Sequence, residues 1–302
     1  AFGGYEAFSV TNGLAQLHRT LDLPGQTAQP HRAGQPTVDP EKGRPVEILL
    51  IGSDSRAKTA ADGRSDTIML LHLDADRKSA YLISFPRDMW VDIPGHGKNK
   101  INAAYAWGGT NLLASTINKL TGVTIDHAAV IDFAGFADLT DSVGGVTITN
   151  NFAFQSHHFD YPKGRITLSG EKALWFVRER HALPNGDFGR AANQRKVVKA
   201  LAAKLASPQT LADPTKLSRV ISNLAKYVTV DKSLTDQAIL GLARSMKTAA
   251  SSLVTLQAPV SGTAMIGGQS VDVVDTEQLH QLATALQTDT LAHYVALHKP
   301  DN

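Results

Sequence analysis

The hydrophobic positions along the chain alternate between the spacing of strands and the spacing of helices. Short apolar runs rich in β-branched residues predict strands over residues 46–51, 67–73, 79–85, 127–131, 146–149, 253–260 and 271–274. Apolar residues three and four positions apart predict helices over residues 111–120, 133–141, 171–177, 188–205, 217–227, 234–246 and 277–286. Because the two kinds of element are interspersed, the pattern predicts an α/β layered fold with a central, mostly buried sheet.

Residues at the ends of the predicted helices support these boundaries. Asp132 and Ser169 each precede a predicted helix and can act as N-caps, since their side-chain oxygens can accept a hydrogen bond from the first turn. Ser233 and Asp236 have the spacing of a capping box, and Gly122 follows the helix expected to end at residue 120. These residues predict where three helices begin and where one ends.

The first 45 residues differ from the rest of the chain. Residues 1–20 are weakly amphipathic and predict a short helix, and the segment from Pro24 to Pro45 is rich in Pro, Gly, Gln and Thr, as linkers are. We therefore expect an N-terminal segment and linker over residues 1–45 and one large domain over residues 46–302. No stretch reaches the ~20 apolar residues that span a bilayer, so any signal or membrane anchor is expected upstream of Ala1.

Composition and missing motifs narrow the class of protein. The 302 residues are 42% hydrophobic with a formal net charge of +2, which excludes a disordered chain and gives no basic surface for nucleic acid. There is no cysteine, which excludes disulfides, thiolate zinc sites and cysteine nucleophiles. The chain also lacks GxSxG, GxxxxGK[ST] and HExxH motifs, and no dinucleotide-binding glycine pattern follows a strand.

Two acidic residues lie beside neighbouring predicted strands. Asp54 follows the first strand of the domain and Asp66 precedes the second, with 11 residues between them. That loop is long enough to bring both carboxylates to one edge of the sheet, where ligands of open α/β sheets bind. Two carboxylates and phosphate oxygens form a Mg²⁺ site, because Mg²⁺ prefers hard oxygen ligands. The alternative is that both acids cap turns or helices.

Half of the fourteen arginines fall in three segments, residues 51–66, 84–88 and 176–195. In the first segment, Arg64 lies two residues before Asp66. In the second segment, Arg87 and Asp88 come directly after Pro86, at the end of a predicted strand. A planar guanidinium binds phosphate through two parallel hydrogen bonds, which lysine cannot do. The alternative for Arg87 and Asp88 is a surface ion pair.

The third segment carries the remaining candidates. Arg178 and Arg180 share a side only if that piece is extended, whereas Arg190 and Gln194 share one face of a helix. Arg195 lies about 100° away from that face. If these are not ordinary helix-surface side chains, the acids and arginines together surround an anion of pyrophosphate size, which predicts Mg²⁺-assisted phosphoryl transfer or phosphate-ester hydrolysis.

The histidines give a weaker signal. His157, His158 and Asp160 could bind a metal, but we interpret them as solvated loop residues.

These segments, taken in order, closely resemble the LytR-CpsA-Psr family of bacterial cell-wall glycopolymer ligases. The resemblance covers about Val46 to Ala206 and rests on ILLIGSDSR, GRSDTIMLLHLD, SFPRDMWVDIPG, KINAAYAWGG, VIDFAGFADLTDSVGGV, LSGEKALWFVRER and GDFGRAANQR. It implies a three-layer α/β/α sandwich with a central mixed β-sheet and a hydrophobic pocket for a polyprenyl chain. The segment around Phe152–Lys163 and the tail after Ala206 match little.

The resemblance also implies roles for single residues. Asp54 and Asp66 match the family's magnesium-associated acids, for Mg²⁺ or Mn²⁺. The positions that match its pyrophosphate-binding residues are Arg64, Arg87, Arg178, Arg180, Arg190 and Gln194. Arginine is a poor general base because it stays protonated, so a carboxylate such as Asp88 is the candidate for that role.

The activity implied is transfer of a glycan phosphate from polyprenyl pyrophosphate to a muramic acid hydroxyl of peptidoglycan, with pyrophosphatase side activity. The resemblance also implies that the protein lies at the extracytoplasmic face of the cell membrane, anchored by a helix upstream of Ala1.

The glycopolymer is left open between teichoic acid, capsule and arabinogalactan, and the high alanine content favours arabinogalactan. Two alternatives are a polyprenyl or nucleotide pyrophosphate phosphohydrolase and a non-enzymatic lipid-binding regulator. A helix-turn-helix pattern and a basic stripe are both missing, which argues against DNA as a partner.

Overall fold

The structure is a computed structural model that describes residues 13–25, 43–53, 65–211 and 213–298. Its strands are β1 (His18–Leu21), β2 (Val46–Ser53), β3 (Ser65–Leu73), β4 (Ala80–Ser84), β5 (Trp90–Ile93), β6 (Gly97–Lys100), β7 (His127–Asp132), β8 (Val146–Asn150), β9 (Phe154–Ser156), β10 (Phe159–Tyr161), β11 (Gly164–Leu168), β12 (Val228–Asp231), β13 (Leu253–Gln257), β14 (Val260–Ile266) and β15 (Gln269–Val274). Its helices are α2 (Ile101–Thr121), α3 (Phe133–Ser142), α4 (Gly170–Arg178), α5 (Gly186–Leu205), α6 (Pro208–Leu211), α7 (Pro214–Tyr227), α8 (Asp236–Ala249), the 3₁₀ helix η2 (Ala250–Ser252), α9 (Thr276–Gln287) and α10 (Leu291–Leu297).

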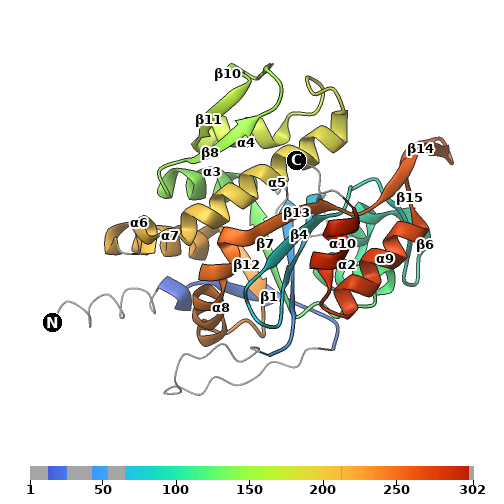
Figure 1. Ribbon diagram of the computed structural model, residues 1–302, viewed down its shortest axis with the longest axis horizontal. Coiled ribbons are helices and arrows are strands. Elements are labelled where there is room, and N and C mark those ends of the chain that lie inside the picture. The colour runs from blue at the N-terminus through green and yellow to red at the C-terminus, as the bar shows by residue number, and fades with distance from the viewer. Residues whose placement is uncertain (1–12, 26–42, 54–64, 212, 299–302) are drawn as a thin grey trace.

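Seven strands form one mixed sheet in the order β1-β12-β7-β2-β3-β4-β13 (Figure 1). The pairs β1–β12, β7–β2 and β4–β13 are parallel, and the other neighbours are antiparallel. The ends of β2, β4, β7 and β13 therefore lie at the same edge of the sheet as the start of β3. Shorter hairpins, such as β9–β10 and β14–β15, project from this core.

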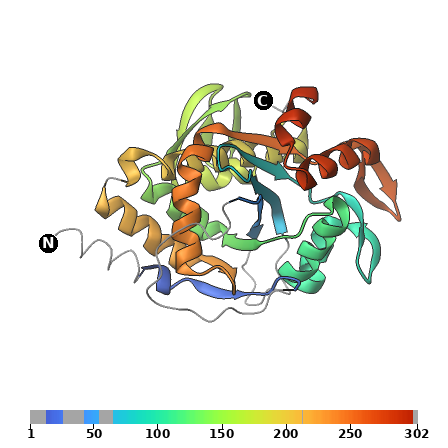
Figure 2. The same ribbon diagram turned by 60° about the horizontal axis from the view of Figure 1, so that its bottom comes forward.

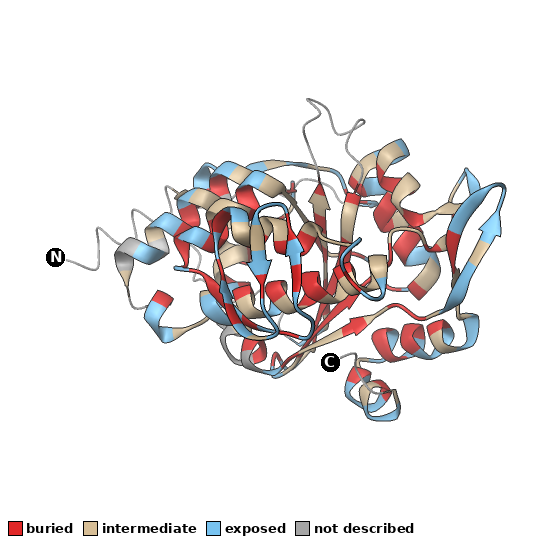
Figure 3. Ribbon diagram, turned by 90° about the horizontal axis from the view of Figure 1, so that it is seen from above, coloured by how far each residue is buried: buried red, intermediate tan, exposed pale blue. Residues whose placement is uncertain are grey.

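Helices cover both faces of the sheet. Alternate residues of β2 point to opposite sides, so that Leu49 packs with α2, α9 and α10, whereas Leu50 packs toward α5 and α8. In Figure 2, α7 and α8 lie on one side of the sheet, and α2 and α9 on the other. Buried residues are concentrated in the strands and on the inner faces of the helices (Figure 3). This confirms the three-layer α/β/α sandwich with a central mixed sheet.

Two of the helix ends expected from the sequence are confirmed. Asp132 is the N-cap of α3, and its carboxylate accepts a hydrogen bond of 2.6 Å from the Gly135 amide. Gly122 ends α2 in the left-handed conformation, with φ of 74°. Ser169 is the N-cap residue of α4 but makes no side-chain cap bond. The Gly170 amide is satisfied by the Thr140 hydroxyl instead.

The N-terminal segment contributes to the sheet. The sequence predicts that residues 1–45 lie outside the domain, with a short helix over residues 1–20, but β1 pairs in parallel with β12 at the sheet edge. Arg19 ties this strand to α8, through an ion pair with Asp236 and a hydrogen bond of 2.9 Å to the Leu234 carbonyl. The partner strand lies about 210 residues away along the chain, and such long-range pairing leaves no local signal.

Two predicted elements have different bounds. Helix α2 begins at Ile101 rather than at residue 111, and Gly108 and Gly109 interrupt it with non-helical angles. The strand predicted over residues 253–260 is β13 and the start of β14, separated at Ala258-Pro259. None of the helices among the described residues is long and apolar enough to cross a membrane.

Candidate active site

The candidate active site lies at the sheet edge where β2 and β4 end and β3 begins. Ser53 and Ser65 are register partners, so the residues just before Asp54 and Asp66 lie side by side on adjacent strands. Asp54 and Arg64 themselves lie outside the described residues. The chain leaves β4 through Pro86, and the Asn102 amide donates a hydrogen bond of 3.2 Å to the Arg87 carbonyl, which fixes this turn.

Arg87 is the centre of a charged cluster. Its guanidinium Nη1 lies 2.6 Å from Asp66 Oδ1, and its Nε lies 3.7 Å from Asp88 Oδ2 and 4.0 Å from Asp187 Oδ1. Arg190 joins the cluster through an ion pair of 2.6 Å with Asp187. We call these five residues the anion cradle. Elements distant in sequence, β3, the turn after β4 and the first turns of α5, therefore meet at one point.

The two arginines of the cradle have different electrostatic surroundings. Burial disfavours the charged form of Arg87, but Asp187, Asp66 and Asp88 outweigh it and raise its pKa. Burial lowers the pKa of Arg190, which is only 7% exposed, and Asp187 opposes this shift. The partly buried Arg87 and the buried Arg190 are thus held by carboxylates, and the first turn of α5 adds a positive helix terminus. An incoming phosphate can replace these carboxylates as the partner of the arginines.

The remaining arginines of the third segment, Arg178, Arg180 and Arg195, each have different surroundings. Arg180 is near enough to Arg190 to contribute to its electrostatics. Its loop is fixed by Glu179, whose Oε1 accepts hydrogen bonds from the amides of residues 180, 181 and 182. Arg178 lies with its guanidinium 4.7 Å from the Phe133 ring centroid. Arg195 does not join the ion pairs of the cradle and instead donates a bond of 2.5 Å to Ser84 Oγ.

An apolar cavity of about 280 Å³ adjoins the cradle. It lies between β2, β7, α3 and α5, and its wall includes Leu50, Phe136 and Val198. Thr67, Met69 and Gln194 line both this cavity and a small pocket that is also lined by Asp66, Arg87 and Arg190. The Gln194 amide donates a bond of 3.1 Å to the Val177 carbonyl, which holds the side chain at this junction. An occupant could therefore place a charged group in the cradle and an apolar group in the cavity.

Three charged residues in or beside the cradle are not among the site residues predicted from the sequence. Asp187 lies within the GDFGRAANQR motif, but its carboxylate had no recognisable role in the sequence. Lys100 at the end of β6 pairs with Asp88 at 2.9 Å. Asp272 on β15 lies against the same turn, where its amide bonds to the Asp88 carbonyl at 2.9 Å. Lys100 lies in the KINAAYAWGG segment, where nothing marks it as a site residue, and Asp272 reaches the site only through long-range packing.

Burial, together with Asp88 and Asp187, raises the pKa of Asp272 to about 6. The Asp272 carboxyl therefore binds a proton more tightly in the native state than in the unfolded chain. Above pH 6 its ionised form lowers the free energy of unfolding, and this loss of stability shrinks as the pH is lowered toward 4. We expect Asp272→Asn to raise the free energy of unfolding by about 1–2 kcal/mol at pH 8 and by much less at pH 4.5. Urea unfolding at the two pH values measures this, with the exposed Asp160→Asn as control. Equal effects of Asp272→Asn at both pH values would contradict it.

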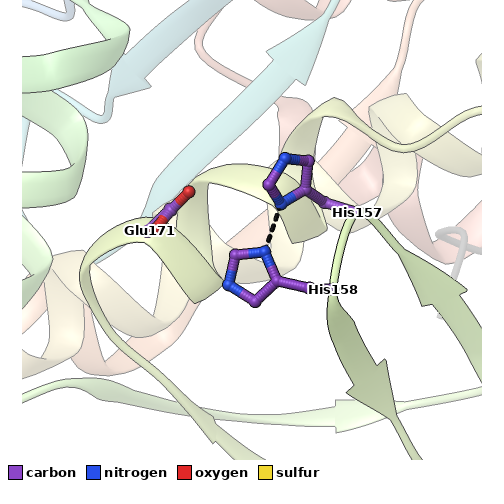
Figure 4. Close-up of side chains that lie close together, drawn as sticks. All are labelled: His157, His158 and Glu171. Atoms are coloured by element: carbon purple, nitrogen blue, oxygen red, sulfur yellow. Dashed lines mark hydrogen bonds between the residues drawn. The ribbon is translucent and has the colours of Figure 1, made fainter.

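The histidine pair lies on the turn between β9 and β10 and shares no residue with the cradle; Figure 4 shows the pair beside Glu171. His157 and His158 face one another through their Nδ1 atoms, and the third possible ligand is Glu171 rather than Asp160. Asp160 pairs with Gln155, and Glu171 accepts a bond of 3.2 Å from the Trp175 indole. All three possible ligands are exposed, which agrees with solvated loop residues.

Comparison with known proteins identifies the family. The sequence profile of the LytR_cpsA_psr family matches residues 15–288. The chain belongs to this family. The match includes β1 and the segments after residue 206 that carry Asp272, so the LytR_cpsA_psr domain extends beyond the region recognised from sequence motifs.

Relatives of this LytR_cpsA_psr protein are named as transferases. The polyisoprenyl-teichoic acid–peptidoglycan teichoic acid transferase TagU of Bacillus cereus is 33% identical over 261 residues, which cover 86% of this chain and 83% of TagU. TagU of Enterococcus faecalis is 34% identical over 212 residues, 70% of this chain and 69% of that protein. Both share the family and most of the length of the domain.

Solved structures agree with the fold. The crystal structure of B. subtilis TagV superposes with a TM-score of 0.71 at 28% identity and covers 82% of this chain and 98% of TagV. The structure of TagT bound to LIIa-WTA superposes with a TM-score of 0.70 at 26% identity and covers 90% of this chain and 99% of TagT.

Proposed function

We propose that the protein transfers a glycopolymer phosphate from a polyprenyl pyrophosphate carrier to a muramic acid hydroxyl of peptidoglycan. The observation that carries this proposal is the junction at Gln194, where the anion cradle meets the apolar cavity. A lipid pyrophosphate needs this pairing of a charged cluster with an apolar compartment. The transferase names of the TagU relatives and the complex of TagT with LIIa-WTA support the same activity.

The residues of the cradle then have distinct tasks. Arg87 and Arg190 bind the pyrophosphate and neutralise the charge that grows on the leaving polyprenyl phosphate. The acceptor oxygen attacks the sugar-proximal phosphorus, a phosphodiester bond forms, and the bond to the bridging oxygen breaks. The hydroxyl proton leaves with a base, and polyprenyl monophosphate is the second product. Arg180, Arg178 and Arg64 are proposed as further pyrophosphate contacts.

Mg²⁺ or Mn²⁺ fits the donor chemistry of this edge. Asp66 supplies carboxylate oxygens, the hard ligands these ions prefer, and Asp54 follows the strand end next to it. We propose that Asp54 and Asp66 hold the ion. When bound, it would neutralise phosphate charge beside the arginines.

Two carboxylates are candidates for the base. Asp88 is ion-paired with Lys100 and Arg87. Asp272, with its pKa raised to about 6, is the other candidate of this cluster.

The apolar cavity is proposed to hold the polyprenyl chain. Val198 lines it from α5 and is partly exposed, so Val198→Phe should fill part of the volume without disturbing the cradle. We expect KM for a long-chain donor to rise about tenfold, the loss of one to two buried CH₂ groups. KM for a short-chain analogue should stay unchanged. Steady-state kinetics with the two donors measures this, and equal effects on both would contradict the assignment.

The proposed location follows from the same chemistry. Peptidoglycan lies outside the cytoplasmic membrane and the donor lipid lies within it, so we propose an extracytoplasmic, membrane-attached protein. Which glycopolymer it transfers stays a prediction, with teichoic acid favoured by the relatives' names.

Product analysis separates this function from pyrophosphate hydrolysis. A transferase should release polyprenyl monophosphate slowly without acceptor and faster when peptidoglycan oligomers are supplied. Release that ignores the oligomers would favour the phosphohydrolase.

A further inference from the structure

A second, larger cavity of about 580 Å³ lies on the opposite face of α5 from the anion cradle. Residues 187, 190 and 194 of α5 line the cradle pocket, whereas residues 189, 193 and 196 line this cavity. At 100° per residue the two sets project from opposite sides of the helix. Its other walls are the chain after β8, the loop before α5 and the end of β13 (Figure 1). We call this cavity the amide groove.

The lining of the amide groove is rich in carboxamides and aromatic rings. Asn151, Asn185 and Gln257 offer amide donors and acceptors at its wall. Phe152 is 49% exposed at this wall, so its ring is accessible to a ligand in the groove. Saccharides present hydroxyl and acetamido groups at their rims and apolar C–H groups on their ring faces, so amides and exposed aromatic rings match both.

One buried side-chain amide of the lining lacks a hydrogen-bond partner for its donor. Asn193 is only 6% exposed, and its Nδ2 has no hydrogen-bond partner among the described residues. A buried donor without a partner is costly. The groove thus contains a polar side chain that its own surroundings leave unsatisfied.

The charge of the groove is positive. Lys196 and Arg195 both line it, and no described residue of its lining is acidic. Burial, with a further contribution from Arg195, lowers the pKa of Lys196. An anionic group in the groove would offset the cost of burying this ammonium.

The groove is connected to the reaction site through the wall between them. Arg195 Nη1 donates to Ser84 Oγ at 2.5 Å and to Gln257 Oε1 at 3.3 Å. Ser84 belongs to the cradle pocket and Gln257 to the groove. The separation is therefore one helix, about 10 Å across, a distance that a short oligosaccharide can span around the start of α5.

We propose that the amide groove binds an anionic, N-acetylated saccharide, and that this saccharide is the acceptor glycan with its stem-peptide carboxylates. The proposal rests on the proposed transferase function. The donor is expected to fill the cradle and the apolar cavity on one face of α5, which leaves the opposite face for a substrate that arrives separately. The sugars of the donor have the same chemistry, so the test measures both substrates.

The test compares Lys196→Gln and Phe152→Ser with matched controls. Lys199→Gln removes an exposed charge from the same helix, and Trp107→Ser removes a ring that is also 49% exposed but lies outside the groove. KM is measured for a soluble GlcNAc–MurNAc oligosaccharide with stem peptides and, separately, for the lipid-linked donor. We expect KM for the oligosaccharide to rise roughly five- to tenfold in the two groove variants. KM for the donor and both KM values of the controls should stay at the wild-type level.

If only the KM for the donor rises, the groove binds a saccharide but that saccharide is the donor's sugar, and the assignment to the acceptor is wrong. If neither KM changes in the groove variants, the proposal is wrong. Saturation-transfer NMR with the oligosaccharide and no donor gives a second readout that does not depend on turnover. Signals in the wild-type protein that weaken in Lys196→Gln would support the groove even if transfer failed, whereas transfer with no such signals would overturn the groove and leave the proposed function standing.

Discussion

Arg87→Ala should lower the rate of glycopolymer transfer by about 10²–10³-fold, the loss typical when one preorganised donor to a developing anion is removed. Arg87 contacts Asp66, Asp88 and Asp187 at once. Its removal therefore takes away a phosphate ligand and also leaves Asp66 facing the anion without the arginine, whereas Asp88 and Asp187 keep their ion pairs with Lys100 and Arg190. Arg87→Lys should recover only part of the rate, because an ammonium keeps the charge but lacks the planar fork.

Initial rates of polyprenyl monophosphate release with peptidoglycan oligomers measure this effect. Arg165→Ala, at an exposed position of β11, is the control for removal of an arginine elsewhere. Thermal unfolding of each variant shows whether the fold is kept. An Arg87→Ala protein that is folded and transfers at the wild-type rate would remove Arg87 from the mechanism.

Asp66→Asn should reduce transfer about 100-fold and abolish stimulation by Mg²⁺ or Mn²⁺. The amide keeps the size of the side chain but loses the negative oxygen that a hard cation prefers. It also weakens the bond that Arg87 Nη1 donates, now 2.6 Å long, because a neutral amide oxygen replaces the charged one, so the guanidinium should lose part of its orientation. Asp54→Asn is expected to act in the same way if the two acids hold one ion.

Rates across a Mg²⁺ titration, together with calorimetric binding of Mn²⁺ to the protein alone, measure both parts of this prediction. Asp160→Asn, on the β9–β10 hairpin, is the matched acid-to-amide control. Full activity of the wild-type protein in excess chelator would show that the arginines suffice and that the metal assignment is wrong.

The parts of the fold that could be predicted are those with a local cause. The alternation of Leu49 and Leu50 toward opposite faces is visible in the sequence as an apolar run, and Asp132 and Gly122 mark helix ends by their own chemistry. The pairing of β1 with β12 and the break in α2 at Gly108–Gly109 depend on contacts made only in the folded chain.

In the candidate site, too, residues within local motifs could be predicted, whereas residues that arrive through long-range contacts could not. Arg87, Asp88, Arg190 and Gln194 were recognised because motifs at strand and helix ends carry them. Lys100 and Asp272 join Asp88 from a short hairpin and from the C-terminal region, and no spacing rule connects such positions. The residues that line the two cavities could not be predicted, since a side chain that lines a cavity and one that fills the core have the same sequence signature.

The most direct test of the account is detection of the covalent product. The purified protein is incubated with a polyprenyl-pyrophosphate-linked glycan and peptidoglycan oligomers, and the muramidase digest is analysed by mass spectrometry. We predict a sugar–phosphate–muramic acid adduct, formed in step with the acceptor-dependent release of polyprenyl monophosphate and about 10²–10³-fold more slowly with Arg87→Ala. Release of polyprenyl monophosphate at the same rate with and without oligomers, and with no adduct, would contradict transfer to peptidoglycan.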